Sequence, residues 1–253
     1  MEYVRLGKTD ILVSRIAFGA MRLSNALGQD NAASIVRKAY DSGINFFDTT
    51  SKIPESEKLL GDALYDIRRN VFLSTTTAAL TAKEIKDNIE ESLMSLHCDT
   101  VDLYQFETEK FLPIPGGADK IYDTLCELKR NSKINHIGIV TTNTQTAKKA
   151  IQSGLFETLQ FPFNPVSSDE TIEIVKMCEE YDVGFLAMQP LCGGVIQNIP
   201  LALGFLHQYE NVVPLWGVQT QEELEQILYF NDHPPVIDEQ FNEDIENLRN
   251  FFN

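Results

Sequence analysis

Residues 43–50 read GINFFDTT, and the fold prediction rests first on the pattern in this short stretch. Gly43 is typical of a residue that ends a helix, and the run Asn45–Asp48 after it has the length and composition of a buried strand. Thr49 and Thr50 follow, so a polar segment begins directly after the strand. A helix, a glycine and a short apolar strand form the repeating unit of a parallel α/β sheet.

The same unit recurs along the chain, and each apolar run is followed by a helix-like stretch. The other runs are Arg15–Phe18, Val71–Thr75, Val101–Phe106, His136–Val140, Thr158–Pro162, Gly184–Met188 and Val212–Trp216. Parallel strands are buried on both faces, and they therefore appear as apolar blocks rather than as alternating patterns. Eight strand–helix units in 253 residues match the size of a (β/α)8 TIM barrel, which we predict as one domain over residues 1–253.

Capping signatures indicate where helices begin between these strands. Three Ser/Thr-x-x-Glu pairs occur, namely Thr81/Glu84, Ser167/Glu170 and Thr220/Glu223. Gly154 is expected to end another helix. The segments 3–6 and 12–14 predict an N-terminal β-hairpin ahead of the barrel, and Asp238–Phe252 predicts a C-terminal helix.

An open doubly wound sheet is the main alternative fold. That fold is expected to carry a glycine-rich phosphate loop after its first strand. Residues 19–23 read GAMRL and contain no GxGxxG motif. The missing loop and the number of strands together favour the barrel.

The composition narrows the classes of partner. With 37 acidic and 21 basic residues the formal net charge is −16, which argues against a nucleic-acid partner because polyanions repel the chain. No apolar run is long enough to span a bilayer, and the charged residues Glu2 and Arg5 argue against a signal peptide, so we expect no membrane association and a cytoplasmic location.

Cysteines and histidines give no metal signature. The cysteines at positions 98, 126, 178 and 192 form no CxxC pair, and the four histidines show no ligand spacing, so we predict no metal site. Cys192 lies after the seventh strand and is interpreted as a packing residue near the pocket, rather than as a nucleophile.

Several segments resemble the aldo-keto reductase family, in order and over nearly the whole chain. They are Tyr3–Thr9, Phe18–Leu23, Gly43–Thr49, Asp102–Gln105, His136–Ile139, Leu159–Asn164 and Ala187–Gly194. The resemblance is strongest to a bacterial and archaeal branch that often carries a ferredoxin-like C-terminal tail, and that tail is not in this sequence. The resemblance implies a barrel that reduces carbonyls with NADPH or NADH, using a tetrad of Asp, Tyr, Lys and His.

Motif by motif, the tetrad is degenerate. The Asp matches Asp48, but the Tyr position is Ile53, the Lys position is Thr76 and the His position is Glu107. Isoleucine cannot donate a proton, and threonine cannot lower the pKa of a phenol by its charge. Asp48 and Glu107 are therefore the remaining candidate catalytic residues, in a polar mouth with Lys52 nearby.

The positions that hold the dinucleotide in the family are also altered. Gln160 is kept, a stacking Tyr becomes Phe163, an amide becomes Thr141, a Lys becomes Gln189, and Gly217 is kept. No Lys or Arg occurs between Lys176 and Arg249, the part expected to clamp cofactor phosphates. We therefore expect no cofactor or weakly bound NAD(H), and we expect NADP(H) to be disfavoured.

These features favour a non-reductase, a pseudoenzyme that acts as a ligand-binding, accessory or regulatory barrel. Its partner is expected to be a protein or a small molecule at the barrel mouth. Two alternatives stay open: a divergent NAD(P)H-dependent oxidoreductase that uses Asp48 and Glu107, and a redox-free acid–base enzyme, lyase- or isomerase-like, at the same mouth.

Overall fold

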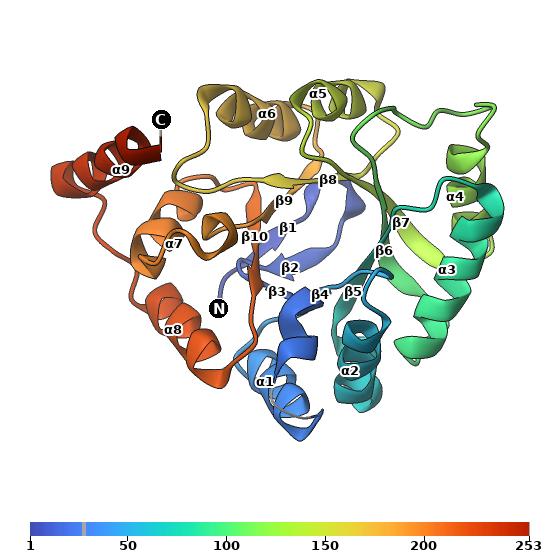
Figure 1. Ribbon diagram of the computed structural model, residues 1–253, viewed down its shortest axis with the longest axis horizontal. Helices are drawn as coiled ribbons and strands as arrows, with labels where there is room; N and C mark the ends of the chain where they lie inside the picture. Colours follow the sequence, from blue (N-terminus) through green and yellow to red (C-terminus); the bar gives the residue numbers. More distant parts are fainter. Residues whose placement is uncertain (27–28, 253) are drawn as a thin grey trace.

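Eight parallel strands close into a barrel in the computed structural model, which describes residues 1–26 and 29–252 (Figure 1). The strands are β3 (Ala17–Gly19), β4 (Phe46–Asp48), β5 (Phe72–Thr77), β6 (Val101–Glu107), β7 (Ile134–Val140), β8 (Thr158–Pro162), β9 (Gly184–Met188) and β10 (Val212–Gly217). β10 pairs with β3 and closes the ring. This confirms the predicted (β/α)8 fold, and every predicted strand end lies within two residues of an observed one.

Helices surround the barrel, as the alternating pattern predicted. They are α1 (Gln29–Asp41), α2 (Pro54–Leu64), α3 (Ala82–Ser95), α4 (Ile121–Arg130), α5 (Thr144–Ser153), α6 (Asp169–Glu180), α7 (Ile199–His207), α8 (Gln221–Asp232) and α9 (Glu239–Phe252). Short 3-10 helices also occur at Gly7–Thr9, Ala20–Asn25, Tyr65–Asn70 and Cys192–Gly194. In the described part of the chain, no helix combines the length and the apolar character needed to cross a membrane.

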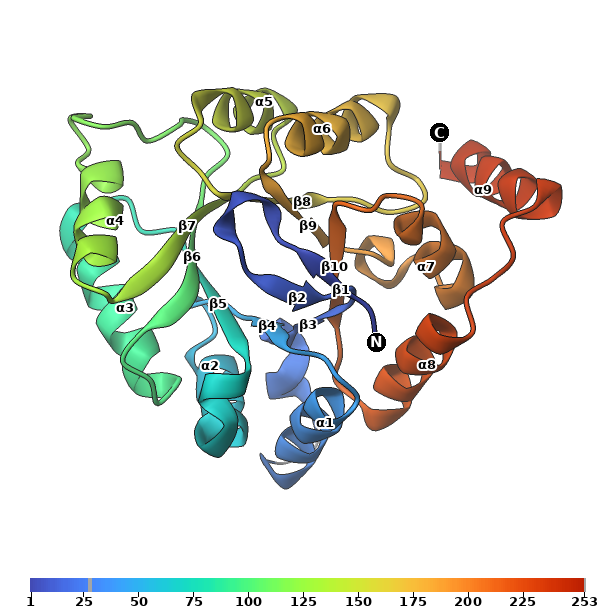
Figure 2. The ribbon, with the colours of Figure 1, turned by 180° about the vertical axis from the view of Figure 1, so that it is seen from behind.

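The N-terminal hairpin closes one end of the barrel. β1 (Tyr3–Arg5) and β2 (Leu12–Ser14) pair antiparallel and lie across that end, as Figure 2 shows. Their apolar side chains Leu6, Ile11 and Val13 pack with the inward-facing residues of the barrel strands. The ligand-accessible mouth is therefore the opposite end, where the strands finish.

Two of the three predicted capping signatures are confirmed. The hydroxyls of Thr81 and Thr220 each accept a hydrogen bond from the backbone N–H three residues later. The prediction for Ser167 was wrong, because the next residue, Ser168, caps α6 and accepts from the N–H of Thr171. The hydroxyl of Ser167 instead accepts from the N–H of Asn164 and shapes the loop after β8.

The interior of the barrel changes from apolar to polar along its axis. Near the hairpin, the inward residues Phe46, Leu103 and Leu186 form an apolar layer. Side chains alternate along a strand, so the next inward positions lie two residues further towards the mouth. Those positions carry polar groups, and all are buried: they are Asp48, Ser74, Gln105 and Gln160.

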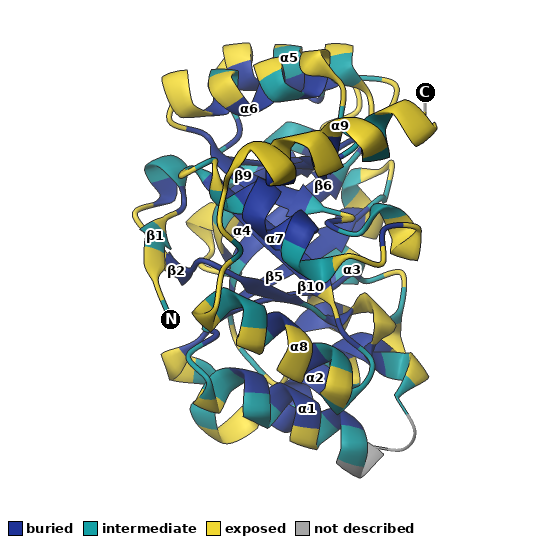
Figure 3. Cartoon of the chain, turned by 90° about the vertical axis from the view of Figure 1, so that its left-hand side faces the viewer, coloured by how far each residue is buried: buried dark blue, intermediate teal, exposed yellow. Residues whose placement is uncertain are grey.

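Helix α7 is apolar on nearly all sides, because the barrel covers one face and α9 covers another. Figure 3 shows α7 almost entirely buried beneath the exposed α9. A Cβ atom added at Gly204 of α7 would lie 2.6 Å from Pro235 and 2.8 Å from Phe241, so the absence of a side chain lets the two segments approach. Arg249 of α9 then donates to the carbonyl of Pro165, beside the mouth.

Candidate functional site

Asp48 lies at the end of β4 in the polar layer of the barrel, with only 3% of its surface exposed. The Nε2 atom of Gln105 lies 3.2 Å from its Oδ1, and Ser74 and Gln160 also hydrogen-bond to the carboxyl group. Burial raises the pKa of Asp48 to about 7, although the three hydrogen bonds oppose the shift. In the described part of the chain, no lysine or arginine forms an ion pair with this carboxyl.

Gln105 is the residue at the centre of this polar layer, and the sequence argument missed it. Its Nε2 also lies 3.1 Å from the hydroxyl of Ser74 and 2.7 Å from Oε1 of Gln160. A Cβ added at Gly138 would lie 2.3 Å from Oγ1 of Thr158 and 3.0 Å from the Gln105 side chain. Gly138 therefore makes the room in which Gln105 reaches Asp48.

We expect Gly138→Ala to destabilise the fold by about 2 kcal/mol, because the new methyl group overpacks the polar layer. Chemical denaturation checks this. The double variant Gly138→Ala with Thr158→Ala removes the closest atom and should recover part of the loss. A single variant as stable as the parent chain would contradict the packing described here.

Glu107 lies at the mouth, at the end of β6, and its carboxylate binds a lysine. Its Oε2 lies 2.6 Å from Nζ of Lys52, and 32% of its side chain is exposed. The structure describes no hydrogen bond between Asp48 and Glu107. The two candidate carboxyl groups thus have different surroundings, one buried among neutral groups and the other in an ion pair at the surface.

Ile53 and Thr76 lie where the resemblance expects the Tyr and the Lys. Ile53 is half-buried and precedes the first turn of α2. Thr76 is buried on β5, and its carbonyl accepts hydrogen bonds from the hydroxyls of Thr50 and Ser51. These contacts tie the loop after β4 to β5 with uncharged groups alone.

Two buried threonines of β5, Thr75 and Thr77, point away from the barrel interior and so do not line the mouth. Thr75 donates to the buried carboxyl of Glu57 on α2 at 2.6 Å, and Thr77 accepts from Asn88 on α3. Burial raises the pKa of Glu57, against hydrogen bonds that lower it. Both threonines share the outward side of β5 with Leu73 and so lie behind the barrel wall.

The expectation that Phe163 offers an open ring face is wrong in this structure. Its side chain is fully buried and packs against Phe185, Phe205 and Tyr209, with ring centroids 5.0–5.8 Å apart. Counting from Leu159 along β8 puts Phe163 on the outward side of the strand. On the neighbouring β9, the alternation of side chains places Met188 on the inward side at the mouth. Met188 was not among the site residues predicted from the sequence.

The other residues expected to hold a cofactor are engaged elsewhere or exposed. Thr141 is buried, and its hydroxyl, with the N–H and hydroxyl of Thr142, binds the carboxylate of Glu109 from the loop after β6. Gln189 is exposed, with a positive φ of 56°, and its carbonyl accepts from Asn164. Cys192 is half-buried in the following turn.

Gly217, at the end of β10, has a neighbour that the sequence could not reveal. A Cβ at Gly217 would lie 3.3 Å from Cδ of Arg22, so the side chain of Arg22 runs over the glycine. Arg22 has no ion pair in the described part of the chain. However, the first turn of α8 is already occupied, because Glu223 accepts from the N–H of Gln219 at 2.9 Å.

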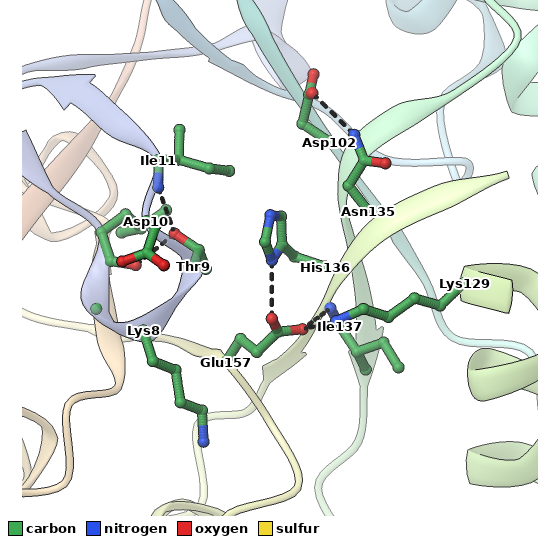
Figure 4. Close-up of polar contacts among 12 residues, drawn as sticks. Lys8, Thr9, Asp10, Ile11, Asp102, Lys129, Asn135, His136, Ile137 and Glu157 are labelled. Carbon is green, nitrogen blue, oxygen red and sulfur yellow. Dashed lines mark hydrogen bonds and ion pairs between the residues drawn. The ribbon is translucent and has the colours of Figure 1, made fainter. Parts of the chain in front are cut away.

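A second polar cluster lies at the hairpin end of the barrel (Figure 4). Glu157 accepts from the N–H of Ile137 and contacts His136 and Lys129 at 2.8 Å each. Partial burial favours protonation of Glu157, but these partners outweigh it and lower its pKa to about 2. Polar groups at this end of a TIM barrel serve stability. Among the described residues, no group of three His, Cys, Asp or Glu side chains is arranged to hold a metal ion.

Fold and site together define the class: a (β/α)8 barrel with a hairpin-closed base and a polar centre at its mouth. A family model described as "Aldo/keto reductase family" matches residues 15–199. The chain therefore belongs to the aldo/keto reductase family.

Named relatives agree with this assignment, and a solved structure has the same fold. An uncharacterised oxidoreductase of Bacillus subtilis is 24% identical over 79% of this chain and 68% of its own length. The L-galactose dehydrogenase of Arabidopsis thaliana is 26% identical over 78% of this chain and 67% of its own. The chain thus spans about two thirds of these relatives. An aldo-keto reductase structure from Bacillus halodurans, in its holo form, superposes with a TM-score of 0.84 at 19% identity, covering 98% of this chain and 96% of that one.

Proposed function

We propose that this chain is a ligand-binding barrel that does not reduce carbonyls, with an accessory or regulatory role in the cytoplasm. The observation that carries the proposal is the surroundings of Asp48. Its carboxyl group contacts only uncharged side chains, whereas the reaction implied by the family needs a lysine that lowers the pKa of a tyrosine. The lysine at this mouth, Lys52, is bound to Glu107 instead.

Tyr104, the tyrosine next to Gln105 in the sequence, is not placed to replace the missing acid. Tyr104 of β6 is fully buried on the outward side, and its hydroxyl lies 3.5 Å from the carbonyl of Ile85. Burial raises the pKa of this phenol, which makes it a poorer proton donor.

The residues present do not fit a nicotinamide dinucleotide well. The ring of Phe163 has no free face, Glu109 occupies the groups of Thr141 and Thr142, and Glu223 occupies the start of α8. The cationic side chain of Arg22, beside Gly217, would favour a phosphate. We therefore derive no reaction step through this cofactor.

We expect no consumption of NADH or NADPH above the protein-free rate when methylglyoxal or an aromatic aldehyde is supplied. The absorbance of the reduced nicotinamide measures this directly. Trp216, the single tryptophan, precedes Gly217 and reports binding by its fluorescence. Turnover that Asp48→Ala abolishes would refute the proposal, as would submicromolar binding of NADPH.

A redox-free acid–base reaction is a second candidate, because an acid with a pKa of about 7 can give or take a proton near neutral pH. Native mass spectrometry of the purified protein tests this candidate by revealing a co-purified ligand. Loss of that ligand in Asp48→Asn, with retention in the surface variant Asp232→Asn, would support it. If neither the parent chain nor the two variants carries a ligand, that result would count against this candidate.

A further inference from the structure

A surface groove lies between the start of α7 and the exposed face of α8, beside the mouth of the barrel. Its volume is about 560 Å³. Apolar side chains form much of its lining, namely Ile199, Pro200, Tyr229 and Phe230. Tyr229 is 57% exposed, and its ring stacks on that of His233, with the centroids 4.5 Å apart.

Two carboxylates border the apolar lining, and one of them is free. Glu225 forms an ion pair with Lys38 of α1. Glu222, one helical turn earlier on α8, is exposed and has no ion pair in the described part of the chain. The groove therefore combines an aromatic surface with an uncompensated negative charge at its edge.

The helices beside this groove are rich in acidic residues. Residues 177–248 contain 13 of the 37 acidic residues and none of the 21 Lys and Arg. Nine of these 13 lie in α8, in α9 or in the segment between them, and Lys38 of α1 pairs with one of the nine, Glu225. A field of this kind attracts cationic segments and repels acidic ones.

We infer that the α7–α8 groove binds a basic amphipathic segment of a partner protein, in which lysine or arginine side chains accompany apolar ones. The apolar side chains of the segment lie on Ile199, Tyr229 and Phe230, and a cationic side chain reaches Glu222. A carboxylate attracts such a cation and accepts hydrogen bonds from it. This inference is independent of whether the barrel reduces carbonyls, because the groove does not include Asp48 or Glu107.

A labelled synthetic helix of leucine and lysine is the probe, and fluorescence anisotropy at low salt measures its binding to the full chain. We expect Glu222→Lys to weaken binding at least 10-fold and Tyr229→Ala to weaken it several-fold. The matched control is Glu243→Lys on the exposed face of α9, which makes the same charge change outside the groove and should weaken binding less than about 2-fold. Thermal melting confirms that each variant is folded.

Four outcomes would overturn the inference. Equal weakening by Glu222→Lys and Glu243→Lys would show general electrostatic attraction without a site. Equally tight binding of spermine or of a leucine-free lysine peptide would show a site for small cations. Equal binding of a leucine–glutamate peptide would show apolar adhesion alone. Absence of binding at millimolar peptide would show that the groove has no such partner.

Discussion

Replacing Asp48 by asparagine should make this protein more stable at alkaline pH. In the folded protein, burial raises the pKa of Asp48 from the ordinary 3.8 to about 7. Between these two values the folded state keeps a proton that the unfolded state releases, so the free energy of unfolding falls as pH rises. Above pH 7 the loss of unfolding free energy caused by the buried charge is complete, at about 4 kcal/mol in total. Asparagine keeps an oxygen that can accept from Gln105 but has no charge to bury.

Chemical denaturation of both proteins between pH 5 and pH 9 measures the effect. The stability advantage of Asp48→Asn should grow by about 3 kcal/mol over this range. The contributions of other titrating groups cancel when the stabilities of the two proteins are subtracted. One such group is His207, whose pKa is lowered to about 4 by burial. The stabilisation from Glu157 is nearly complete at pH 5, because that pH lies above both its ordinary pKa of 4.5 and its folded pKa of about 2. A constant gap between the two proteins would show that Asp48 is ionised in the folded state throughout.

The second large effect is expected at Phe163. Phe163→Ala should cost about 4 kcal/mol of unfolding free energy, because it empties the centre of the cluster with Phe185, Phe205 and Tyr209. If the ring served mainly to stack on a cofactor, the loss of stability would be small and only nucleotide binding would change.

Two comparisons make the Phe163 result interpretable. Phe251→Ala removes the same atoms at a position that is 81% exposed, and its cost should stay below about 0.5 kcal/mol. Phe163→Leu refills most of the volume and should remain folded even if the alanine variant does not. Denaturant midpoints of the three variants rank their losses of stability. A loss for Phe163→Ala as small as that for Phe251→Ala would contradict the buried cluster.

The strands and the candidate carboxyl groups could be predicted from the sequence, because both depend on local patterns. Buried parallel strands leave apolar runs, and the polar Asp48 at the end of one run marks the mouth. Gln105 could also have been found, since it is a polar residue two positions after the inward Leu103. The same count along β8 would have placed Phe163 behind the barrel wall.

Contacts across the closed ring could not be predicted in this way. Pairing of β10 with β3 brings the first strand–helix unit against the last, so Arg22 lies over Gly217 and Lys38 of α1 binds Glu225 of α8. In the sequence, residues 177–248 simply lack cations. In the folded protein, two basic residues from the N-terminal part, Arg22 and Lys38, lie against this region.

The sequence by itself determined the repeating unit, its number of copies and the candidate carboxyl groups Asp48 and Glu107. These follow from hydrophobic periodicity and residue identity, which act over a few residues. Only the tertiary structure decided that neutral groups enclose Asp48, that Lys52 forms an ion pair with Glu107 and that Phe163 is buried in the core. Those outcomes depend on which side of each strand faces inwards and on which distant segments the closed barrel brings together, and burial and pairing then fix the charge of each group.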